Sequence, residues 1–292
     1  MNNCAAAQRR DRMSGRGIMR FFVDDDFDLE KIAESGQCFR WEKMDEQTYR
    51  IPAGNRCLYI SALGDGWFEA DCPEKEFDLF WREYFDLGEN YRNIRKRVDP
   101  EIDPFLHNAC ESENGIRILR QDPWETLISF IISQNKNIPA IRRSISLLCE
   151  ACGELMADNN GENYYAFPSP SALLALDDTA LKQCRLGYRC SYVHKAAAAV
   201  CNEEIDLQKL LSEKEKETIR VLTGLYGVGV KVASCVSLFG LHHLNAFPVD
   251  VWIGRILANE YPGGYPREKY APYNGIYQQY MFAYYRSREH RR

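Results

Sequence analysis

Two hydrophobic patterns divide the chain into a front part and a back part. Up to about residue 72, apolar residues come in short runs rich in aromatic and β-branched side chains, with Gly, Asp and Asn between the runs. Such runs are typical of short strands. From residue 74 onward, apolar residues recur every three or four positions, which predicts helices. The predicted fold class is therefore α+β, with an N-terminal antiparallel β-sheet domain packed on a mainly α-helical core.

The front part holds five runs that predict the strands of this sheet. They are IMRFFV from Ile18, CFRWEK, TYRIPA, CLYISAL and GWFEADC. We interpret the acidic run Asp24–Asp26 as a solvated turn. Residues 74–98 predict a helix, because Phe and Leu supply one apolar side, and a second short helix is expected at residues 103–110.

The back part begins with a helix that starts at Pro123 and breaks between Gln134 and Pro139 before the apolar spacing resumes. Further helices are expected at residues 171–182, 189–200, 206–211 and 271–288. The last of these is rich in tyrosine, a feature more typical of a core than of a base-stacking surface.

We expect three segments along the chain. Residues 1–17 are polar, carry four arginines and lack the apolar core of a secretion signal, so we interpret them as a flexible tail. Residues 18–115 form the N-terminal antiparallel sheet domain with its helices, and residues 116–292 form the helical domain.

The stretch Leu222–Asp250, LTGLYGVGVKVASCVSLFGLHHLNAFPVD, carries the strongest chemical signal. Gly224, Gly227 and Gly229 interrupt what would otherwise be one amphipathic helix, and glycine tolerates the close approaches of a tight hairpin. The pattern predicts a helix–hairpin–helix. Its row of backbone amides suits a phosphate anion, and such contacts hold a DNA backbone without reading its sequence.

Lys231, in the first turn of the second helix, has two interpretations. In one, it only touches a phosphate. In the other, it is a nucleophile that forms a Schiff base with a sugar C1′, helped by the helix dipole, which disfavours a positive charge there. Asp250 stands nineteen residues on, in PVDVWIGRIL, where it is expected to cap a new helix. A carboxylate fixed in that way can also stabilise positive charge on a deoxyribose ring.

The net charge of −5 is unevenly distributed. Residues 1–115 carry 16 Lys and Arg against 24 Asp and Glu, a balance of −8, whereas residues 116–292 carry 21 against 18, a balance of +3. The back part is therefore the one expected to contact DNA, with modest and strongly salt-dependent non-specific affinity.

The eleven cysteines are scattered and are expected to be reduced thiols. Cys149 and Cys152 form one CxxC, but no second pair follows at the spacing of a zinc site. No apolar run is long enough to span a bilayer, so no membrane partner is expected. We expect a monomer in the cytoplasm of a prokaryote, associated with DNA.

Five motifs in order narrow the family: SGQCFRW (Ser35–Trp41), LRQDPWETLISFIISQNKNI (Leu119–Ile138), LGYR (Leu186–Arg189), the hairpin with PVD, and Gln278 with Phe282. With them the chain resembles the 8-oxoguanine DNA glycosylase/lyases of the helix–hairpin–helix, Gly/Pro-Asp superfamily over residues 18–288. The resemblance implies an enzyme that flips a damaged base out of duplex DNA, excises it and then nicks the strand by β-elimination.

The resemblance also implies roles for individual residues. Lys231 would attack C1′ and Asp250 would stabilise the sugar cation. The base pocket would be formed by Gly36, whose carbonyl accepts the N7–H of 8-oxoguanine, by Cys235 and Phe282 on the two faces of the base, and by Gln278 at its Watson–Crick edge. DNA would be held by Asn135, Tyr188, Arg189 and the amides of Gly227, Gly229 and Val232. The carbonyls of Thr223, Leu225 and Val228 would hold a monovalent cation.

No cofactor beyond that cation is implied, and the partner is double-stranded DNA with an oxidised guanine. Some relatives carry an iron–sulfur cluster after the catalytic Asp, but no cysteine follows Cys235 here. Two positions depart from the eukaryotic members of the family. Ala140 stands where they have a second cytosine-reading arginine, and Trp252 where they have a phosphate-binding histidine. We therefore expect weaker discrimination for cytosine opposite the lesion.

Three alternatives stay open at this point. A related glycosylase could act on a different damaged base. A protein of another class could use the same fold as a lesion sensor without catalysis, and would then bind but not cleave. A general helix–hairpin–helix DNA-binding subunit is the third, and it leaves the pocket motifs unexplained. Excision assays on a panel of lesions separate the first alternative from an 8-oxoguanine enzyme.

Overall fold

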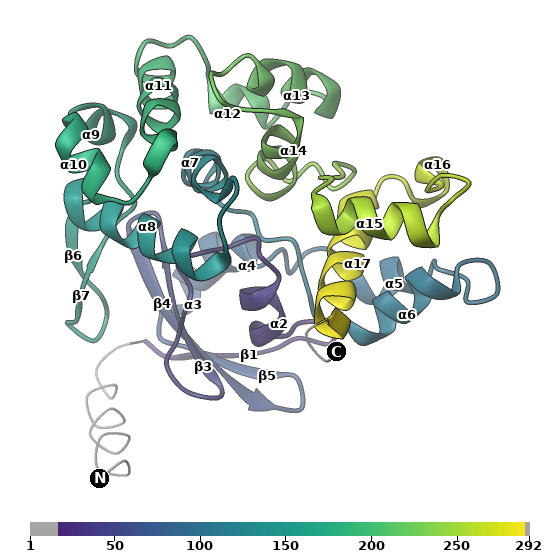
Figure 1. Ribbon diagram of the computed structural model, residues 1–292. Helices are drawn as coiled ribbons and strands as arrows, with labels where there is room; N and C mark the ends of the chain where they lie inside the picture. Colours follow the sequence, from purple (N-terminus) through teal and green to yellow (C-terminus); the bar gives the residue numbers. More distant parts are fainter. Residues whose placement is uncertain (1–16, 290–292) are drawn as a thin grey trace.

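The computed structural model describes residues 17–289, so nearly all of the predicted tail lies outside it. A five-stranded antiparallel sheet has the order β1-β5-β4-β3-β2 and lies at one end of the molecule, below the helices in Figure 1. Its strands are β1 (Met19–Phe22), β2 (Glu42–Lys43), β3 (Thr48–Ala53), β4 (Arg56–Gly64) and β5 (Trp67–Ala70). The fold class is as predicted, and four of the five predicted runs form strands over most of their length.

One strand prediction is largely wrong, because CFRWEK forms a strand only at Glu42–Lys43. The residues before it form no strand; instead, the side chain of one of them hydrogen-bonds the backbone of residues 117–119. Gln37 Nε2 donates to the Arg117 carbonyl at 2.8 Å, and the Leu119 amide donates to Gln37 Oε1 at 2.8 Å. These bonds fix the buried turn that contains Gly36 against the start of the helical part.

The helix predicted over residues 74–98 is broken. It consists of α3 (Glu74–Glu76), a π-helical turn (Phe77–Trp81) and α4 (Arg82–Tyr84), and α5 (Tyr91–Arg95) follows after a gap. The break falls at Asp86, which has a left-handed backbone (φ 51°) and a buried side chain. A further helix, α2 (Leu29–Glu34), was not predicted, although Asp28 caps it by accepting from the Lys31 amide at 3.0 Å.

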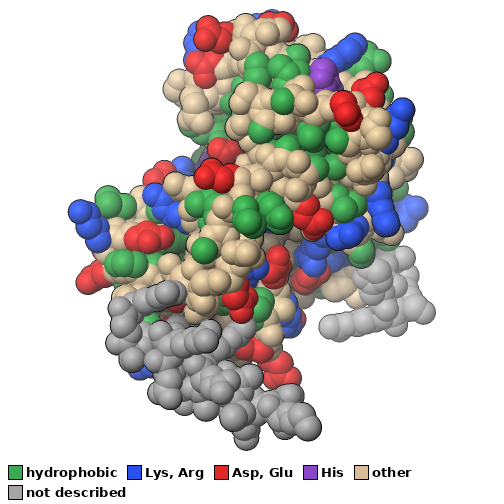
Figure 2. Space-filling view, turned by 90° about the vertical axis from the view of Figure 1, so that its left-hand side faces the viewer, with side chains coloured by type: hydrophobic (Ala, Val, Ile, Leu, Met, Phe, Trp, Pro, Cys, Tyr) green, Lys and Arg blue, Asp and Glu red, His purple; other side chains and the backbone are tan. Residues whose placement is uncertain are grey.

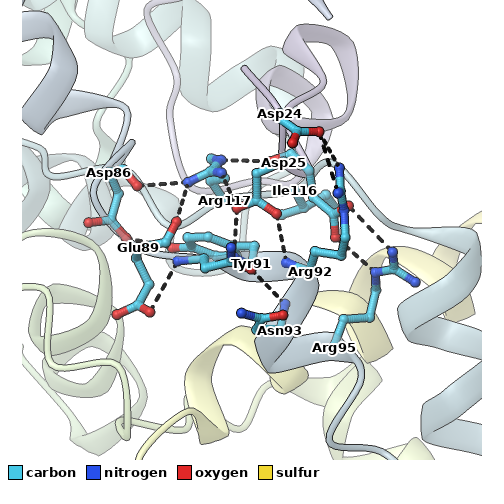
Figure 3. Close-up of polar contacts among 12 residues, drawn as sticks. Asp24, Asp25, Asp86, Glu89, Tyr91, Arg92, Asn93, Arg95, Ile116 and Arg117 are labelled. Atoms are coloured by element: carbon cyan, nitrogen blue, oxygen red, sulfur yellow. Dashed lines mark hydrogen bonds and ion pairs between the residues drawn. The ribbon is translucent and has the colours of Figure 1, made fainter. Parts of the chain in front are cut away.

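The interpretation of Asp24–Asp26 as a solvated turn is wrong (Figure 3). Asp25 accepts from the amides of Tyr91 and Arg92 at the start of α5, each at 2.8 Å, and pairs with the buried Arg117 at 2.6 Å. Asp26 pairs with Arg95 at 2.8 Å. The acidic run is thus the partner of cations that are distant in sequence, and it joins the sheet end of the chain to α5.

The helical part is built around α7 (Pro123–Ser133), which starts at Pro123 and ends at the predicted break. Nine of its eleven residues are buried, so it runs through the core, with α8 (Ile138–Cys152) and α11 (Cys190–Cys201) on one side and α14 (Val230–Phe239) on another (Figure 1). Short helices complete this part: α9 (Pro170–Leu174), α10 (Asp178–Gln183) and α12 (Leu207–Leu210).

The C-terminal helices cover the other side of the core. They are α15 (Val251–Glu260), α16 (Arg267–Tyr270) and α17 (Asn274–Glu289), and α17 packs against α6 (Pro104–Ser112) and α15. Most tyrosines of α17 are buried or half-buried, as a core helix requires. The boundary at residue 115 stays a prediction. The buried residues of α5 and α6 belong to the same hydrophobic cluster as those of α7 and α17.

A two-stranded hairpin, β6 (Leu155–Ala157) with β7 (Asn163–Tyr165), was not predicted. It reaches from the helical part to the sheet, where Asp158 pairs with Arg50 at 3.0 Å and accepts from the Tyr59 hydroxyl at 2.9 Å. Figure 2 shows the face that includes this region, with acidic and basic side chains interspersed over it. In the described residues, no helix is long and apolar enough to cross a membrane.

Candidate active site

The predicted helix–hairpin–helix is present. Helix α13 (Glu215–Thr223) ends at Gly224, and α14 begins after Gly229. Gly227 has a left-handed backbone (φ 81°), the conformation that glycine adopts without a steric penalty. The backbone amides of Gly227, Gly229 and Val232 donate to no acceptor in the described part of the chain. Free amides at the start of a helix are suited to bind an anion.

Lys231 lies in the first turn of α14 and is half-buried, with Nζ 5.3 Å from the centre of the Phe130 ring. It is close enough to Cys235, one turn further along the helix, to lower the pKa of that thiol. Burial raises the pKa of Cys235 to about 11, the positive charge of Lys231 opposes that rise, and the Asp250 carboxylate adds to it. Three predicted site residues therefore act on one another electrostatically.

Asp250 is the N-cap of α15, as its place in the sequence predicted. Its Oδ1 accepts from the Ile253 amide at 2.8 Å, and within the described residues Oδ2 accepts no hydrogen bond. The cap fixes the carboxylate near Lys231 and Cys235 and leaves one oxygen available. A carboxylate held in this way can face a developing positive charge without reorganising.

Gly36 and Phe282 come from opposite ends of the chain and meet. Gly36 has a left-handed backbone (φ 82°), and a Cβ built on it would lie 3.6 Å from Phe282 Cε1. Gln278, one turn before Phe282 on α17, is buried and donates to the Pro248 carbonyl at 3.1 Å. The segment that carries Asp250 is thus fastened to the helix that carries Phe282.

A second group of predicted residues surrounds the hairpin. Asn135 is exposed, with a left-handed backbone (φ 51°), in the break between α7 and α8. Tyr188 is 54% exposed, and its ring lies 4.3 Å from the guanidinium carbon of Arg189. Arg189 itself is buried and donates to the carbonyls of Gln134 and Leu186. The structure thus ties the Arg189 loop directly to the Asn135 loop.

Two residues that the sequence did not indicate strengthen this tie. Lys136 Nζ donates to the Arg185 carbonyl and to Ser144 Oγ, both at 2.6 Å, and burial followed by the positive charge of Arg189 lowers its pKa. Gln134 Nε2 donates to the Gly227 carbonyl at 3.1 Å. No local pattern reveals either role, because each bond joins segments that are far apart in sequence.

A third unpredicted residue, Tyr192, lies between the hairpin and the Tyr188 turn. Its ring centre is 5.6 Å from that of Tyr188 and 5.3 Å from that of Tyr226, both in edge-on contact. The only sequence signal for it is its position one helical turn after Tyr188. Hairpin, Asn135 loop and Tyr188 turn therefore form one connected surface.

The predicted cation ligands lie at the hairpin. The Leu225 carbonyl accepts the turn hydrogen bond of the Val228 amide at 3.1 Å, whereas the carbonyls of Thr223 and Val228 accept none outside the helices. No group of three or more His, Cys, Asp or Glu side chains in the described residues is arranged to hold a metal ion. Of the two departures, Ala140 lies in the first turn of α8 and Trp252 packs against Tyr285 and Arg255.

A cavity of about 670 Å³ opens on the side of Lys231 that faces α13. Its lining includes Lys231 and Ser234 of α14, Ile219 of α13, and Phe247 and Val249 of the segment before Asp250. The amine of Lys231 thus lies between this cavity and the thiol of Cys235. Together, the fold and this site are those of a helix–hairpin–helix DNA glycosylase.

The comparisons with known proteins give the particular family. Residues 21–127 match the 8-oxoguanine DNA glycosylase N-terminal domain, and residues 128–263 match the HhH-GPD superfamily of base excision DNA repair proteins. The N-glycosylase/DNA lyase of Saccharomyces cerevisiae is 32% identical over 80% of this chain and 68% of its own. The chain belongs to the 8-oxoguanine DNA glycosylase/lyase family.

Two solved structures agree with this assignment. One is MBOgg1 in complex with a low-affinity DNA ligand, with a TM-score of 0.87 and 37% identity over 93% of this chain and 96% of that one. The other is the 8-oxoguanine glycosylase/lyase of Clostridium acetobutylicum with double-stranded DNA containing cytosine opposite 8-oxoG. Its TM-score is 0.84, with 33% identity over 93% and 98% of the two chains. The predicted family, fold class and enzyme class are confirmed.

Proposed function

We propose that this protein removes 8-oxoguanine from duplex DNA and then nicks the strand. The observation that carries the proposal is the convergence of Lys231, Cys235 and Asp250 beside the contact of Gly36 with Phe282. A nucleophilic amine next to a fixed carboxylate suits attack on a sugar carbon, and the Phe282 ring beside Gly36 suits the face of a flipped base.

The first step is base removal. The neutral amine of Lys231 attacks C1′, the C1′–N9 bond breaks, and its electron pair leaves with the base, which takes up a proton. The nitrogen then loses its protons as the sugar ring opens, giving a Schiff base. Asp250 stabilises the positive charge that develops on the sugar, because its carboxylate is held by the Ile253 amide and has one free oxygen.

The second step is strand cleavage. A proton leaves C2′ of the Schiff base and the C3′–O bond breaks, so the phosphate leaves with the downstream strand. Water then hydrolyses the imine and restores Lys231. The group that takes the C2′ proton is not assigned to a residue of this chain.

Lesion selection would depend on Gly36. Oxidation at C8 converts N7 of guanine from an acceptor into an N–H donor, so a carbonyl at Gly36 pairs with the lesion and repels normal guanine. One such hydrogen bond contributes about 1–3 kcal/mol, so other contacts must add to selectivity. Cys235 and Phe282 would pack on the two faces of the base, and Gln278 would contact its Watson–Crick edge.

The remaining predicted residues would hold the DNA. The amides of Gly227, Gly229 and Val232 would bind a phosphate, Asn135 would fill the space left by the base, and Tyr188 with Arg189 would contact the orphaned partner. We propose that the carbonyls of Thr223, Leu225 and Val228 bind a monovalent cation. No iron–sulfur cluster or other cofactor would take part, and the protein would act as a monomer.

The test is borohydride trapping on a duplex with 8-oxoguanine opposite cytosine, using the wild type, Lys231→Gln and Lys209→Gln. Lys209 lies on α12, outside the site, and controls for loss of one positive charge. We expect a covalent adduct with the wild type and Lys209→Gln only. Tight binding without any adduct would favour a lesion sensor, and an adduct only on other lesions would favour a related glycosylase. An adduct with Lys231→Gln would mean that another amine is the nucleophile.

A further inference from the structure

The cavity beside Lys231 has a basic end that the proposed chemistry does not use. Lys214, Lys216 and Arg267 line it together with Glu215. The two lysines stand at the start of α13, and Arg267 is the first residue of α16. These elements are separated by more than forty residues in sequence, so no local charge pattern explains why their cations meet at one cavity.

The three cations are free of carboxylate partners. In the described chain, Lys214, Lys216 and Arg267 form no ion pair, and all three are exposed. The nearest acid of the set, Glu215, accepts from Asn245 Nδ2 at 3.3 Å, and Glu217 is paired with Arg220. Three cations against the single carboxylate of Glu215 give this cavity a positive balance, so it is complementary to a negatively charged ligand.

The remaining lining is apolar and suits the sugar and base that accompany a phosphate. Phe247 stacks against Tyr265, with ring centres 4.9 Å apart, and Arg267 lies over the Phe247 ring at 4.7 Å. At the mouth, Val230 is 65% exposed. Phe247 is itself buried, so the exposed guanidinium plane of Arg267 is the surface on which an unpaired base can stack. A volume of about 670 Å³ lies within the usual range of ligand sites.

The position of Lys231 identifies the ligand. Lys231 lines this cavity and, by the proposed function on which this inference rests, bonds to C1′ of the excised nucleotide. The cavity therefore lies beside the position of the lesion's sugar, where the neighbouring nucleotide of the same strand is the nearest anionic group. We propose that it binds the neighbouring nucleotide of the lesion strand, with its phosphate between Lys214, Lys216 and Arg267.

The consequence is a second phosphate site, separate from the hairpin amides. It would hold the strand on the flank of Lys231 during attack and would also retain the cleaved product. Removing one cation should weaken binding roughly fivefold to tenfold at 0.1 M salt and lower the slope of log Kd against log salt by about one. Excision at saturating enzyme should change little, because Lys231 and Asp250 are untouched.

The experiment combines protein and DNA changes. We would measure Kd for Lys216→Gln and Arg267→Gln on lesion duplexes in which one phosphate at a time, on either side of the lesion, is replaced by a neutral methylphosphonate. Lys269→Gln is the matched control, because Lys269 is exposed, lies on the same short helix as Arg267 and does not line the cavity. At the phosphate that the cavity contacts, the effects of the protein substitution and of the methylphosphonate on the binding free energy should not be additive.

We expect the protein substitution and the methylphosphonate to be coupled at one linkage next to the lesion. This coupling should be present for Lys216→Gln and Arg267→Gln and absent for Lys269→Gln. Additive effects at every linkage, equal to those of Lys269→Gln, would overturn the inference. A second result would also overturn it. If a free mononucleotide competes with the wild type for DNA, and Lys216→Gln and Arg267→Gln abolish that competition but show no coupling to any phosphate, the cavity binds small ligands instead. Borohydride trapping on the same duplexes distinguishes a failure of this inference from a failure of the proposed function. If an adduct forms but the effects are additive, only this inference is refuted. If the wild type forms no adduct, the proposed function is refuted.

Discussion

Gly227 lies flat against the ring of Tyr192, so closely that a Cβ added to it would come within 2.3 Å of Tyr192 Cγ. The hairpin that we propose to bind a phosphate therefore packs directly on α11, one turn from Tyr188. Because Gln134 also donates to the Gly227 carbonyl, the hairpin, the Asn135 loop and the Tyr188 turn are held as one unit. Residues that we propose to contact opposite strands of a duplex are thus held together by direct contacts within the protein.

Gly227→Ala should unfold or displace the hairpin. The left-handed backbone costs about 1–2 kcal/mol for a non-glycine residue, and overlap with Tyr192 adds about 1–3 kcal/mol. We expect a loss of about 2–4 kcal/mol in unfolding free energy and loss of DNA binding. Gly229→Ala is the matched control, because Gly229 has φ −89° and open space around it. Equal effects of the two substitutions in denaturant titrations would contradict the steric argument.

Gly36→Ala should reduce excision of 8-oxoguanine more than it reduces stability. The added methyl group would lie at ordinary contact distance from Phe282, so the stability cost is the backbone strain of about 1–2 kcal/mol. Relief of that strain would move the carbonyl that is proposed to read N7–H. Gly54→Ala shares the left-handed backbone (φ 57°), has open space around it and lies in the β3–β4 turn. Single-turnover excision should fall for Gly36→Ala only.

Asp71 should make folding stability depend on pH. Its side chain is buried, Oδ1 accepts from the Tyr59 amide at 2.7 Å, and Oδ2 has no partner in the described residues. Burial raises its pKa from 3.8 to about 7, against the hydrogen bond from the Tyr59 amide. The folded state therefore binds more protons than the unfolded state between about pH 4 and pH 7, and stability falls as pH rises through that window.

Asp71→Asn removes this dependence and keeps an acceptor for the Tyr59 amide. The full shift corresponds to about 4 kcal/mol, and relaxation of the site should reduce it to about 2 kcal/mol at pH 8. We expect the unfolding free energy of the variant, measured by urea titration, to increase relative to that of the wild type from pH 4 to pH 8. Asp65→Asn, in an exposed turn, should show no such trend. A difference for Asp71→Asn that is flat with pH would show that the carboxyl ionises normally.

The sequence predicted what local chemistry determines. Four of the five strands follow from short runs of aromatic and β-branched residues, and Asp250 was recognised because an N-cap precedes its own helix. Lys231 was placed in the first turn of α14 because glycines mark the hairpin. In each case, the signal and the structure lie within a few residues of each other, so no knowledge of the fold was needed.

What the sequence did not predict depends on distant partners. Asp25 looked like part of a solvated turn, but its partner Arg117 is 92 residues away. The side chain of Arg189 was assigned to the orphaned base, whereas without DNA it is buried against the Gln134 carbonyl. Lys136 and the β6–β7 hairpin likewise make their contacts across the fold. Such bonds leave no periodicity in the sequence.

Lys136 should position the DNA-binding loops. Its ammonium bonds the Arg185 carbonyl, just before the Tyr188 turn, so Lys136→Met would release that turn from the Asn135 loop. We expect KM for the lesion duplex to rise roughly tenfold and kcat to change little, since a charged hydrogen bond contributes about 1.5–3 kcal/mol. Lys136→Arg should restore most of the affinity, and Lys182→Met on α10 should be neutral. Lower melting temperature with unchanged KM would indicate a purely structural bond.

Weak discrimination for the base opposite the lesion follows from Ala140. The methyl side chain of Ala140 has no hydrogen-bonding atom, and its amide is already used by the Asn137 cap at 3.0 Å. Arg189 is then the one predicted reader of cytosine. A good bidentate contact contributes about 1–3 kcal/mol of discrimination, so a single one supports a preference of at most roughly a hundredfold.

The measurement is the single-turnover excision rate with 8-oxoguanine opposite C, A, G and T. We expect the wild type to prefer C over A by less than roughly a hundredfold, and Ala140→Arg to increase that ratio about tenfold or more. Ser146→Arg, on an exposed position of the same helix, controls for the added charge and should speed binding to all four duplexes alike. A wild-type preference for C of several hundredfold would contradict the prediction. It would mean that Arg189 and the pocket already select cytosine without a second arginine, so Ala140→Arg would not increase the ratio further.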